Sequence, residues 1–351
     1  MKVWLDALTS KQGTLLAHLS LELINKGFDV LITCRRYEYT EGSITRLGLK
    51  PIVIGEYSEG DSYDKVLSDI TRMKELIRLI RKERPHVLIA YPNPSASRIA
   101  FGVGIKYVAL TDSPHAEVPS RLSLPLADVI VASKCIPRAE LISYAHPSAE
   151  IVQYEGVDEI SWVIRSKPRL DYIKSLGLKP YEYVVLRPHE HLATYYKGIE
   201  VNVNIEELIT KIDSYGLTTV FLPRYKVHDD LINKLVSRNV KVRTIKHYYD
   251  GVSLLYYSRA VITGGASLAR ESALLGVPAV TYYPGRLYVN ECLKKFGYPL
   301  YTATSTNEIL NIMKDILNTE VRRKDFSIIV NELRSKFEDV LSIIIDIVSR
   351  L

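Results

Sequence analysis

Two adjacent glycines, Gly264 and Gly265, stand where an apolar run ends and a helical pattern begins. They belong to the stretch TGGASLARESALLGVP, residues 263–278. A backbone without side chains lets a ligand approach the amides at the start of the helix, where unpaired N–H groups and the helix dipole favour an anion. The sequence therefore predicts a phosphate contact at Gly264, Gly265 and the following Ser267. The run is neither a Walker A loop nor a G-x-G-x-x-G fingerprint.

Glu271 lies one turn into this helix among small and apolar residues. A carboxylate there costs free energy unless a partner binds it, and a ribose diol can donate two hydroxyls to one carboxylate. Glu271 is four residues after Ser267, which is not the spacing of a capping box. The alternative is a tight strand-to-helix turn with an early acid favoured by the dipole, and the residues alone leave both interpretations open.

Two arginines, Arg187 and Arg224, each follow directly after a predicted strand of the second half of the chain. Arginine binds phosphate oxygens through a rigid fork of donors, so this pair and the glycines would form a diphosphate site at one edge of a sheet. Lys226 and Arg286 are weaker candidates for the same site. A structural ion pair is the alternative role for each arginine.

A diphosphate site of this kind needs no metal, because positive side chains stabilise the charge on a leaving group. The sequence has no D-x-D pair, and its three cysteines are widely spaced. His189 and His191 alternate along an extended segment and so point to opposite sides. We expect loop polarity or substrate contact for these histidines, and no bound metal.

The first half of the chain carries candidates for proton transfer in the stretch ALTDSPHAEVPSR. Asp112 ends a predicted strand, and His115 and Glu117 follow in a loop. A carboxylate or an imidazole there could take a proton from a hydroxyl group. The alternative is an Asx-type turn at Asp112 with exposed polar neighbours. Asp6 and Asn93 are weaker candidates, since such residues also end strands for local reasons.

Short β-branched runs alternate with helical periodicity along the chain, which predicts α/β architecture with parallel sheets. Seven strands are predicted in the first half (KVWLDAL, DVLITCR, LKPIVIG, HVLIAY, KYVALTD, DVIVAS, EIVQYEG) and six in the second (EYVVLRP, LTTVFLPR, VKVRTIK, RAVITGG, VPAVTYY, YPLYTA). We expect two doubly wound, Rossmann-like domains that face each other across a cleft. The expected boundaries are 1–160, 161–325 and a C-terminal crossover helix over 326–351 that packs back on the first domain. Ligands bind beyond the carboxyl ends of strands in such sheets.

Composition narrows the classes of partner. The net charge is +6 over 351 residues, with the basic residues spread along the chain, so no nucleic-acid partner is expected. No long apolar segment is present, so we expect a cytoplasmic protein. The run RMKELIRLIRKERP (72–85) combines an apolar stripe with basic residues. A solvated helix face is the simpler interpretation, and attraction to the inner face of an anionic membrane or to a lipid-linked acceptor is the other.

The stretch GGASLARESALLGVPAV resembles the sugar-nucleotide loop of GT-B glycosyltransferases and of the similarly folded non-hydrolysing UDP-N-acetylglucosamine 2-epimerases. In those enzymes glycines meet the diphosphate and a glutamate meets the ribose. Nearly the whole chain resembles the archaeal family called domain of unknown function 354. Four further stretches carry this resemblance: VWLDALTSKQ, VVLRPHEHLATYY, VFLPRYKVHDDL and YYDGVSLLYYSRAVITGG. The resemblance implies a GT-B-like fold, with Gly264 and Gly265 at the diphosphate and Glu271 at the ribose of a nucleotide sugar.

These observations favour a metal-independent, inverting glycosyltransferase with a nucleotide-sugar donor, a glycan or lipid-linked acceptor and no further cofactor. An epimerase is the first alternative. The segment from His115 to Glu117 resembles the H-x-E of those enzymes, but the region of Asn93 replaces their preceding acidic residue. YYPGRLYVNE also stands in place of their arginine-rich segment. A non-catalytic protein that binds nucleotide sugars or glycans is the second alternative.

Overall fold

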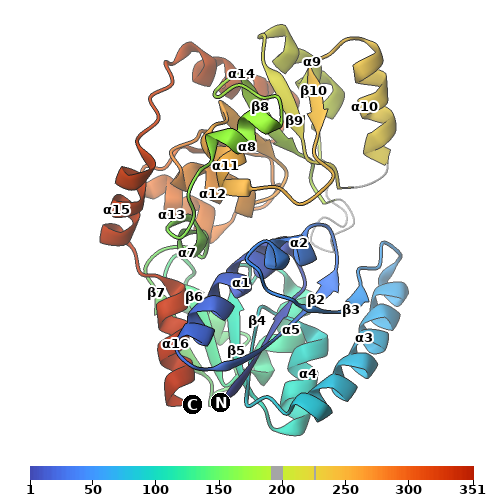
Figure 1. Cartoon of the computed structure of the whole chain (residues 1–351), viewed down its shortest axis with the longest axis vertical. Coiled ribbons are helices and arrows are strands. Elements are labelled where there is room, and N and C mark those ends of the chain that lie inside the picture. The colour runs from blue at the N-terminus through green and yellow to red at the C-terminus, as the bar shows by residue number, and fades with distance from the viewer. Residues whose placement is uncertain (191–200, 225–226) are drawn as a thin grey trace. The chain divides into compact units, whose positions relative to one another are not determined.

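The chain forms two compact units in the computed structural model, which describes residues 1–190, 201–224 and 227–351 (Figure 1). Unit 1 comprises Met1–Trp162 and Phe337–Leu351, and unit 2 comprises Val163–Lys336. His191 and Lys226, two of the residues considered from the sequence, lie outside the described residues. Each unit is built around one parallel β-sheet, and each is described below by itself.

Unit 1 contains a seven-stranded parallel sheet in the order β3-β2-β1-β4-β5-β6-β7. Its strands are β1 (Lys2–Ala7), β2 (Asp29–Arg36), β3 (Ile52–Glu56), β4 (Val87–Ala90), β5 (Lys106–Thr111), β6 (Val129–Ser133) and β7 (Glu150–Tyr154). Strands β4 and β6 are buried along their whole length, as expected for a sheet that is covered on both faces.

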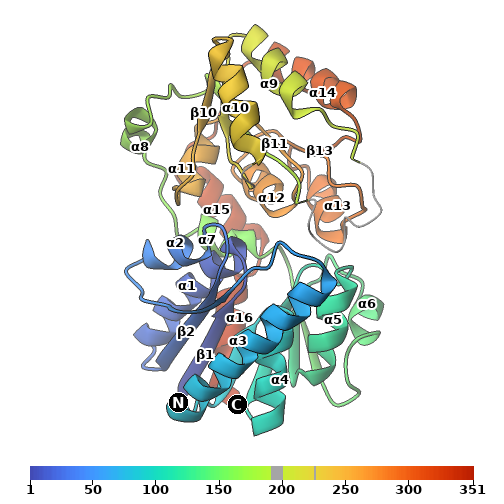
Figure 2. The ribbon, with the colours of Figure 1, turned by 90° about the vertical axis from the view of Figure 1, so that its right-hand side faces the viewer.

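Helices cover both faces of this sheet, because right-handed crossovers that run in opposite directions from the centre place their helices on opposite faces. α1 (Ser10–Asn25) contacts α2 (Thr40–Thr45) and α16 (Val340–Arg350). On the other face, α4 contacts both α3 and α5, and these three helices face the viewer in Figure 2. These three helices are α3 (Ser62–Glu83), α4 (Pro94–Val103) and α5 (Glu117–Ser123). Three short elements follow them in the chain: the 3₁₀ helix η1 (Leu124–Leu126), α6 (Arg138–Ile142) and α7 (Glu159–Val163).

Unit 2 contains a six-stranded parallel sheet in the order β10-β9-β8-β11-β12-β13. Its strands are β8 (Tyr183–Arg187), β9 (Thr218–Phe221), β10 (Val242–Thr244), β11 (Ala260–Thr263), β12 (Ala279–Thr281) and β13 (Leu300–Thr302). Its helices are α8 (Leu170–Ser175), α9 (Ile205–Ser214), α10 (Val227–Ser237), α11 (Gly251–Tyr256), α12 (Ser267–Leu274), α13 (Tyr288–Lys295), α14 (Thr306–Asn318) and α15 (Phe326–Lys336).

All strands predicted from the sequence are present, which confirms two doubly wound parallel sheets. The C-terminal segment differs from the prediction of one helix over 326–351, because α15 and α16 are separate. Asp339 caps α16 by accepting the amide of Leu341, and the amide of Glu338 donates to Glu155. The chain therefore leaves the helical path between them, and α16 packs on α1 as expected. Within the described ranges, none of the helices combines the length and apolar character needed to cross a membrane.

Each sheet has a topological switch point, where the order of the strands reverses direction. In unit 1 the switch point lies between β1 and β4, and in unit 2 it lies between β8 and β11. Loops at the carboxyl ends of these strand pairs diverge and leave room for a ligand. The residues that follow these strands are therefore the first to inspect.

Candidate functional site

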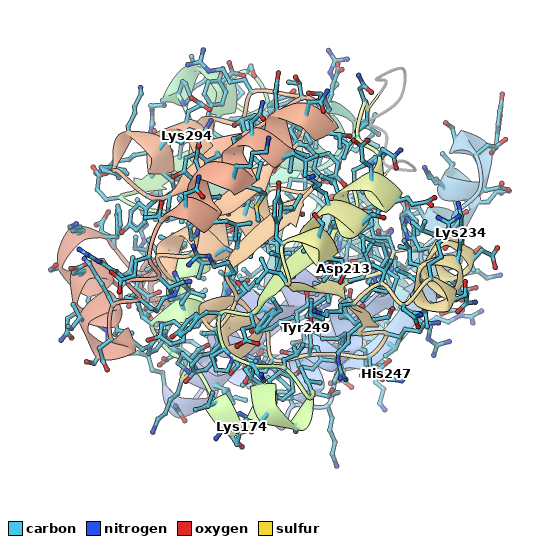
Figure 3. All side chains as sticks on the ribbon, turned by 90° about the horizontal axis from the view of Figure 1, so that it is seen from above. Lys174, Asp213, Lys234, His247, Tyr249 and Lys294 are labelled. Atoms are coloured by element: carbon cyan, nitrogen blue, oxygen red, sulfur yellow. The ribbon has the colours of Figure 1, made fainter. Side chains whose placement is uncertain are left out.

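The switch point of unit 2 brings together two of the predicted ligand-binding segments. Arg187 is the last residue of β8 and pairs with Thr263, the last residue of β11. Gly264 and Gly265 follow directly. The Arg187 guanidinium donates through Nη1 to the hydroxyl of Tyr249, 3.4 Å away, and Tyr249 is labelled in Figure 3. The topology thus places a cationic side chain beside the start of α12.

Gly264 has a packing reason to be glycine. A Cβ atom added at Gly264 would lie 2.3 Å from the Cβ and 2.6 Å from the amide nitrogen of His189. The Gly264 amide donates to the carbonyl of Arg187, 3.0 Å away. This amide is therefore used within the sheet, and the contact with the His189 backbone alone excludes a side chain.

Gly265 differs from its neighbour, because a Cβ there would meet nothing nearer than 3.6 Å. Its amide donates to the Thr263 hydroxyl at 3.0 Å. The next residue, Ala266, is the N-cap of α12 and provides no side-chain capping bond. The amides in the first turn of α12, which begins at Ser267, thus follow Gly265 closely in the chain and receive no side-chain cap from Ala266. They are the best placed donors for an anion.

Arg224 lies close to this helix start, and it also forms the ion pair that the sequence left open. Its Nη1 is 3.2 Å from Oε2 of Glu190, and its Nε donates to the Pro188 carbonyl at 2.8 Å. Its Nη2 would lie 3.6 Å from a Cβ on Gly265. A ligand phosphate at Gly265 would therefore meet a guanidinium that Glu190 and Pro188 already hold in place.

Glu271 points toward the start of α11. Its Oε1 would lie 3.4 Å from a Cβ on Gly251, the first residue of that helix. The neighbouring Arg270 is buried and was missed from the sequence; its Nη2 contacts the Ser267 hydroxyl at 3.4 Å and its Nη1 contacts Asn290 at 3.5 Å. Arg286 is exposed. Arg270 thus ties the first turn of α12 to α13 and fixes its direction.

The two glycines give a matched pair of predictions. Gly264→Ala is expected to lower the free energy of unfolding by roughly 1–3 kcal/mol, because backbone atoms of residue 189 occupy the space of the new methyl group. Gly265→Ala is expected to leave stability within about 0.5 kcal/mol. Urea unfolding of both variants checks this. Equal stabilities would contradict the packing role assigned to Gly264.

The carboxyl edge of the unit 1 sheet holds a lysine among three carboxylates. Nζ of Lys11 is 2.5 Å from Oδ2 of Asp112, 2.6 Å from Oδ2 of Asp158 and 3.9 Å from Oε1 of Glu159. Asp112 follows β5 directly, and its other oxygen accepts the Ser113 hydroxyl at 3.0 Å. The Asp112 side chain keeps 15% of its surface exposed, whereas that of Asp158 keeps 7%. Asp112 is therefore the more accessible of the two aspartates.

Two buried tyrosines hold Asp158 in position. The Tyr91 hydroxyl donates to Oδ2 of Asp158 at 2.6 Å, and the Tyr154 hydroxyl donates to Oδ1. Burial first, and then the neighbouring carboxylates, raise the pKa of both phenols well above the ordinary value of 10.0. Both hydroxyl groups therefore remain protonated donors at neutral pH. Nζ of Lys11 also lies 5.0 Å from the centre of the Tyr91 ring.

The other two proton-transfer candidates are more exposed than Asp112. His115 is exposed in the loop after β5. Glu117 is the first residue of α5, and its carboxylate pairs with Arg121 on the next turn at 3.1 Å, with both side chains mostly exposed. This is the geometry of a solvated helix face, where such pairs contribute little. Of the three candidates, Asp112 contacts the buried cluster directly, through Lys11.

Asp6 and Asn93 belong to a second buried cluster, at the switch point of unit 1 between β1 and β4. Asp6 is fully buried, and Arg72 pairs with its Oδ1 at 2.7 Å. Asn93 donates to the other oxygen at 2.5 Å and also caps α4 by accepting the Ala96 amide. These bonds fix the ends of β1 and β4, so both residues have a structural role. Arg72, which opens the basic run of the sequence, is a buried anchor of α3.

Lys11 and Asp158 were missed from the sequence, since 147 positions separate them along the chain. One feature of the sequence does point to this cluster. Lys11 lies in the first turn of α1, where the helix dipole disfavours a cation. A lysine in that place indicates acidic partners from elsewhere in the fold. Over the ranges 1–190, 201–224 and 227–351, no group of three His, Cys, Asp or Glu residues could hold a metal ion.

Comparison with known proteins identifies a matching family and a relative. A family model described as "Protein of unknown function (DUF354)" matches residues 1–350. An uncharacterized protein of Methanocaldococcus jannaschii is 28% identical over 329 residues, which cover 90% of this chain and 92% of that protein.

Solved structures with a similar fold cover nearly the whole chain. The crystal structure of the M. jannaschii UDP-GlcNAc 2-epimerase in complex with UDP-GlcNAc and UDP has a TM-score of 0.74, 16% identity and full coverage of both chains. Spinosyn forosaminyltransferase SpnP has a TM-score of 0.61 and 15% identity, over 99% of this chain and 98% of that one. These likenesses establish a GT-B-like fold.

Proposed function

The chain belongs to the DUF354 family, and we propose that it is a glycosyltransferase that moves a sugar from a nucleoside diphosphate to an acceptor hydroxyl. One observation carries the proposal. Polar and charged side chains gather at the carboxyl edge of each sheet: Arg187 ends a strand at the switch point of unit 2, and Lys11 contacts Asp112 and Asp158 in unit 1. Those are the two kinds of group that a sugar transfer requires.

Unit 2 binds the nucleotide sugar in this proposal. The diphosphate lies at the first turn of α12, beside Gly265, with Arg187 and Arg224 as cationic partners. Glu271 accepts hydrogen bonds from the ribose hydroxyls. Structural neighbours support a nucleotide-sugar ligand, because they include an enzyme solved with UDP-GlcNAc and UDP and a forosaminyltransferase.

Unit 1 supplies the proton acceptor. The acceptor hydroxyl gives its proton to Asp112 while its oxygen bonds to the anomeric carbon of the sugar. The bond between that carbon and the phosphate oxygen breaks, and the electron pair leaves with the nucleoside diphosphate. The helix dipole and the two arginines stabilise the negative charge that develops there, so the reaction requires no metal ion. Lys11 and Ser113 hold the Asp112 carboxylate in position as proton acceptor.

A 2-epimerase is the second candidate, and a specific observation favours it. Epimerisation by elimination and re-addition requires several acid and base groups, and Lys11 stands in direct contact with Asp112 and Asp158. The sequence alone had shown no such set. Against it, the two aspartates share one lysine and Asp158 is nearly buried, which leaves Asp112 as the more accessible carboxylate.

Turnover distinguishes these functions. The purified protein is incubated with UDP-, GDP- and dTDP-sugars in the presence of chelator, with and without a mixture of glycan and polyprenyl-phosphate acceptors. ³¹P and ¹H NMR follow the products. Acceptor-dependent release of nucleoside diphosphate is the expected result. Interconversion of two nucleotide sugars without an acceptor would identify an epimerase, and binding without either reaction would identify a non-catalytic protein.

A further inference from the structure

The first half of α3 exposes an apolar face. Tyr63, Val66, Leu67 and Ile70 are between 52% and 82% exposed, and the helix buries only Arg72, Leu76 and Ile80. A contiguous set of large exposed apolar side chains is uncommon on a soluble surface unless it binds something. The nucleotide and acid–base sites described above do not use these residues.

α3 is held in place without burying this face. A reciprocal capping box between Asp61 and Asp64 starts the helix. In the third turn Arg72 is buried, donates through Nε to the Ile54 carbonyl at 3.0 Å and pairs with Asp6 at 2.7 Å. The first turns are therefore fixed from both ends and present their apolar residues on a rigid frame.

The same stripe of the helix becomes basic in its second half. Positions three or four residues apart share a helix face, and from Ile70 this spacing leads to three exposed cations, Lys74, Arg78 and Arg81. The acids of α3 lie at other angles around the helix axis: Asp64, Asp69, Glu75 and Glu83. One face thus combines apolar side chains with cations and carries no acid of its own helix.

The neighbouring helices α4 and α5 also expose large apolar side chains. Ser95 of α4 donates to Asp69 of α3 at 3.0 Å, and Ser97 of α4 contacts the Leu122 carbonyl of α5. Leu122 is itself exposed, as are Val118 on α5 and Phe101 on α4. The charged groups that these helices add are Arg98 and the Glu117–Arg121 ion pair. α3, α4 and α5 lie together on the side of unit 1 shown in Figure 2.

We propose that this face of α3, named here the α3 face and defined by Tyr63, Val66, Leu67 and Ile70 with the three cations that follow, binds the surface of an anionic phospholipid bilayer. Aromatic and aliphatic side chains enter the boundary between headgroups and acyl chains, and lysine and arginine pair with lipid phosphates. A second copy of the chain fits less well. A two-fold contact through this stripe brings cations against cations or apolar groups, with no acid on the stripe to pair with them.

Vesicle sedimentation of the full chain tests the proposal. Vesicles of equal parts phosphatidylglycerol and phosphatidylcholine are compared with vesicles of phosphatidylcholine alone. Each comparison is made in low salt and in about 0.5 M NaCl, because salt at that concentration screens attraction between surface charges. We expect binding to the anionic vesicles that weakens in high salt. Absence of binding to the anionic vesicles would overturn the proposal.

Paired variants locate the contact. Arg78→Glu with Arg81→Glu is expected to lower the partition coefficient more than about tenfold, because each cation near the surface accounts for roughly a fivefold change. Lys50→Glu with Lys295→Glu, at exposed positions elsewhere, makes the same charge change and is expected to bind better than the first pair. Leu67→Ser with Ile70→Ser tests the apolar part, with Ile328→Ser as its control. All these positions are exposed, so the variants should fold.

Equal effects of the two charge pairs would mean that net charge and not the α3 face binds the vesicles, and would overturn the proposal. Sedimentation equilibrium measures the oligomeric state and so tests whether the α3 face binds a second copy of the chain. A dimer that dissociates on Leu67→Ser with Ile70→Ser would assign the face to a second copy instead. None of these results depends on the proposed transferase activity, which is measured separately.

Discussion

The Asp112→Asn variant is expected to lose at least about a hundredfold in turnover while it binds the nucleotide sugar with unchanged affinity. The reason is chemical. The amide has nearly the shape of the carboxylate but cannot accept the proton of the acceptor hydroxyl. Nucleoside diphosphate release measures turnover, and calorimetric titration measures affinity for the donor.

The other candidates for the same role give the comparison. Glu117→Gln is expected to change turnover less than about threefold, because the Glu117 carboxylate pairs with Arg121 on an exposed helix face. His115→Ala tests the third candidate, the histidine in the loop after β5, independently of Asp112 and Glu117. If Asp112→Asn turned over normally and Glu117→Gln did not, the base would be misassigned and the Lys11 cluster would be structural.

Replacing Lys11 by methionine is expected to lower the free energy of unfolding of unit 1 by about 3–5 kcal/mol. The substitution leaves Asp158 nearly buried without the cation that lies 2.6 Å from it, and it removes a cationic partner of Asp112. Urea unfolding followed by tryptophan fluorescence reports on unit 1 alone, because both tryptophans of the chain, Trp4 and Trp162, belong to that unit.

Lys106→Met is the matched control, because its partner Asp128 lies at 2.7 Å but the pair is largely exposed. Exposed pairs contribute about 0–1 kcal/mol. Adding Asp158→Asn to Lys11→Met is expected to restore part of the lost stability, since it removes the buried charge left behind. Equal losses for Lys11→Met and Lys106→Met would show that the cluster does not depend on its central cation.

Local patterns were sufficient to predict both sheets. Runs such as VLIA and the first three residues of AVIT are apolar, and helical periodicity or a capping residue follows each run. This alternation along the chain predicts parallel pairing. Arg187 and the glycines could be placed at one sheet edge for the same reason, because each follows its strand directly.

Contacts between distant segments could not be predicted. The partners of Lys11 come from the loops after β5 and β7, and no local pattern specifies them. Gly264 is glycine because of the His189 backbone, a contact between two strand ends that the sequence does not display. The break between α15 and α16 depends on Asp339 and on the pairing of Glu338 with Glu155. In each case a long-range contact determines the local structure.

Isothermal titration of nucleoside diphosphates into the metal-free protein tests the central claim, that unit 2 binds a nucleotide at the start of α12. We expect one nucleoside diphosphate to bind, and both Glu271→Ala and Gly265→Ala to weaken it by about tenfold or more. Gly265→Ala should do so with unchanged stability, because its methyl group has room in the fold but occupies the space of the phosphate. Binding that neither substitution affects, or no binding by a folded protein, would contradict the donor site.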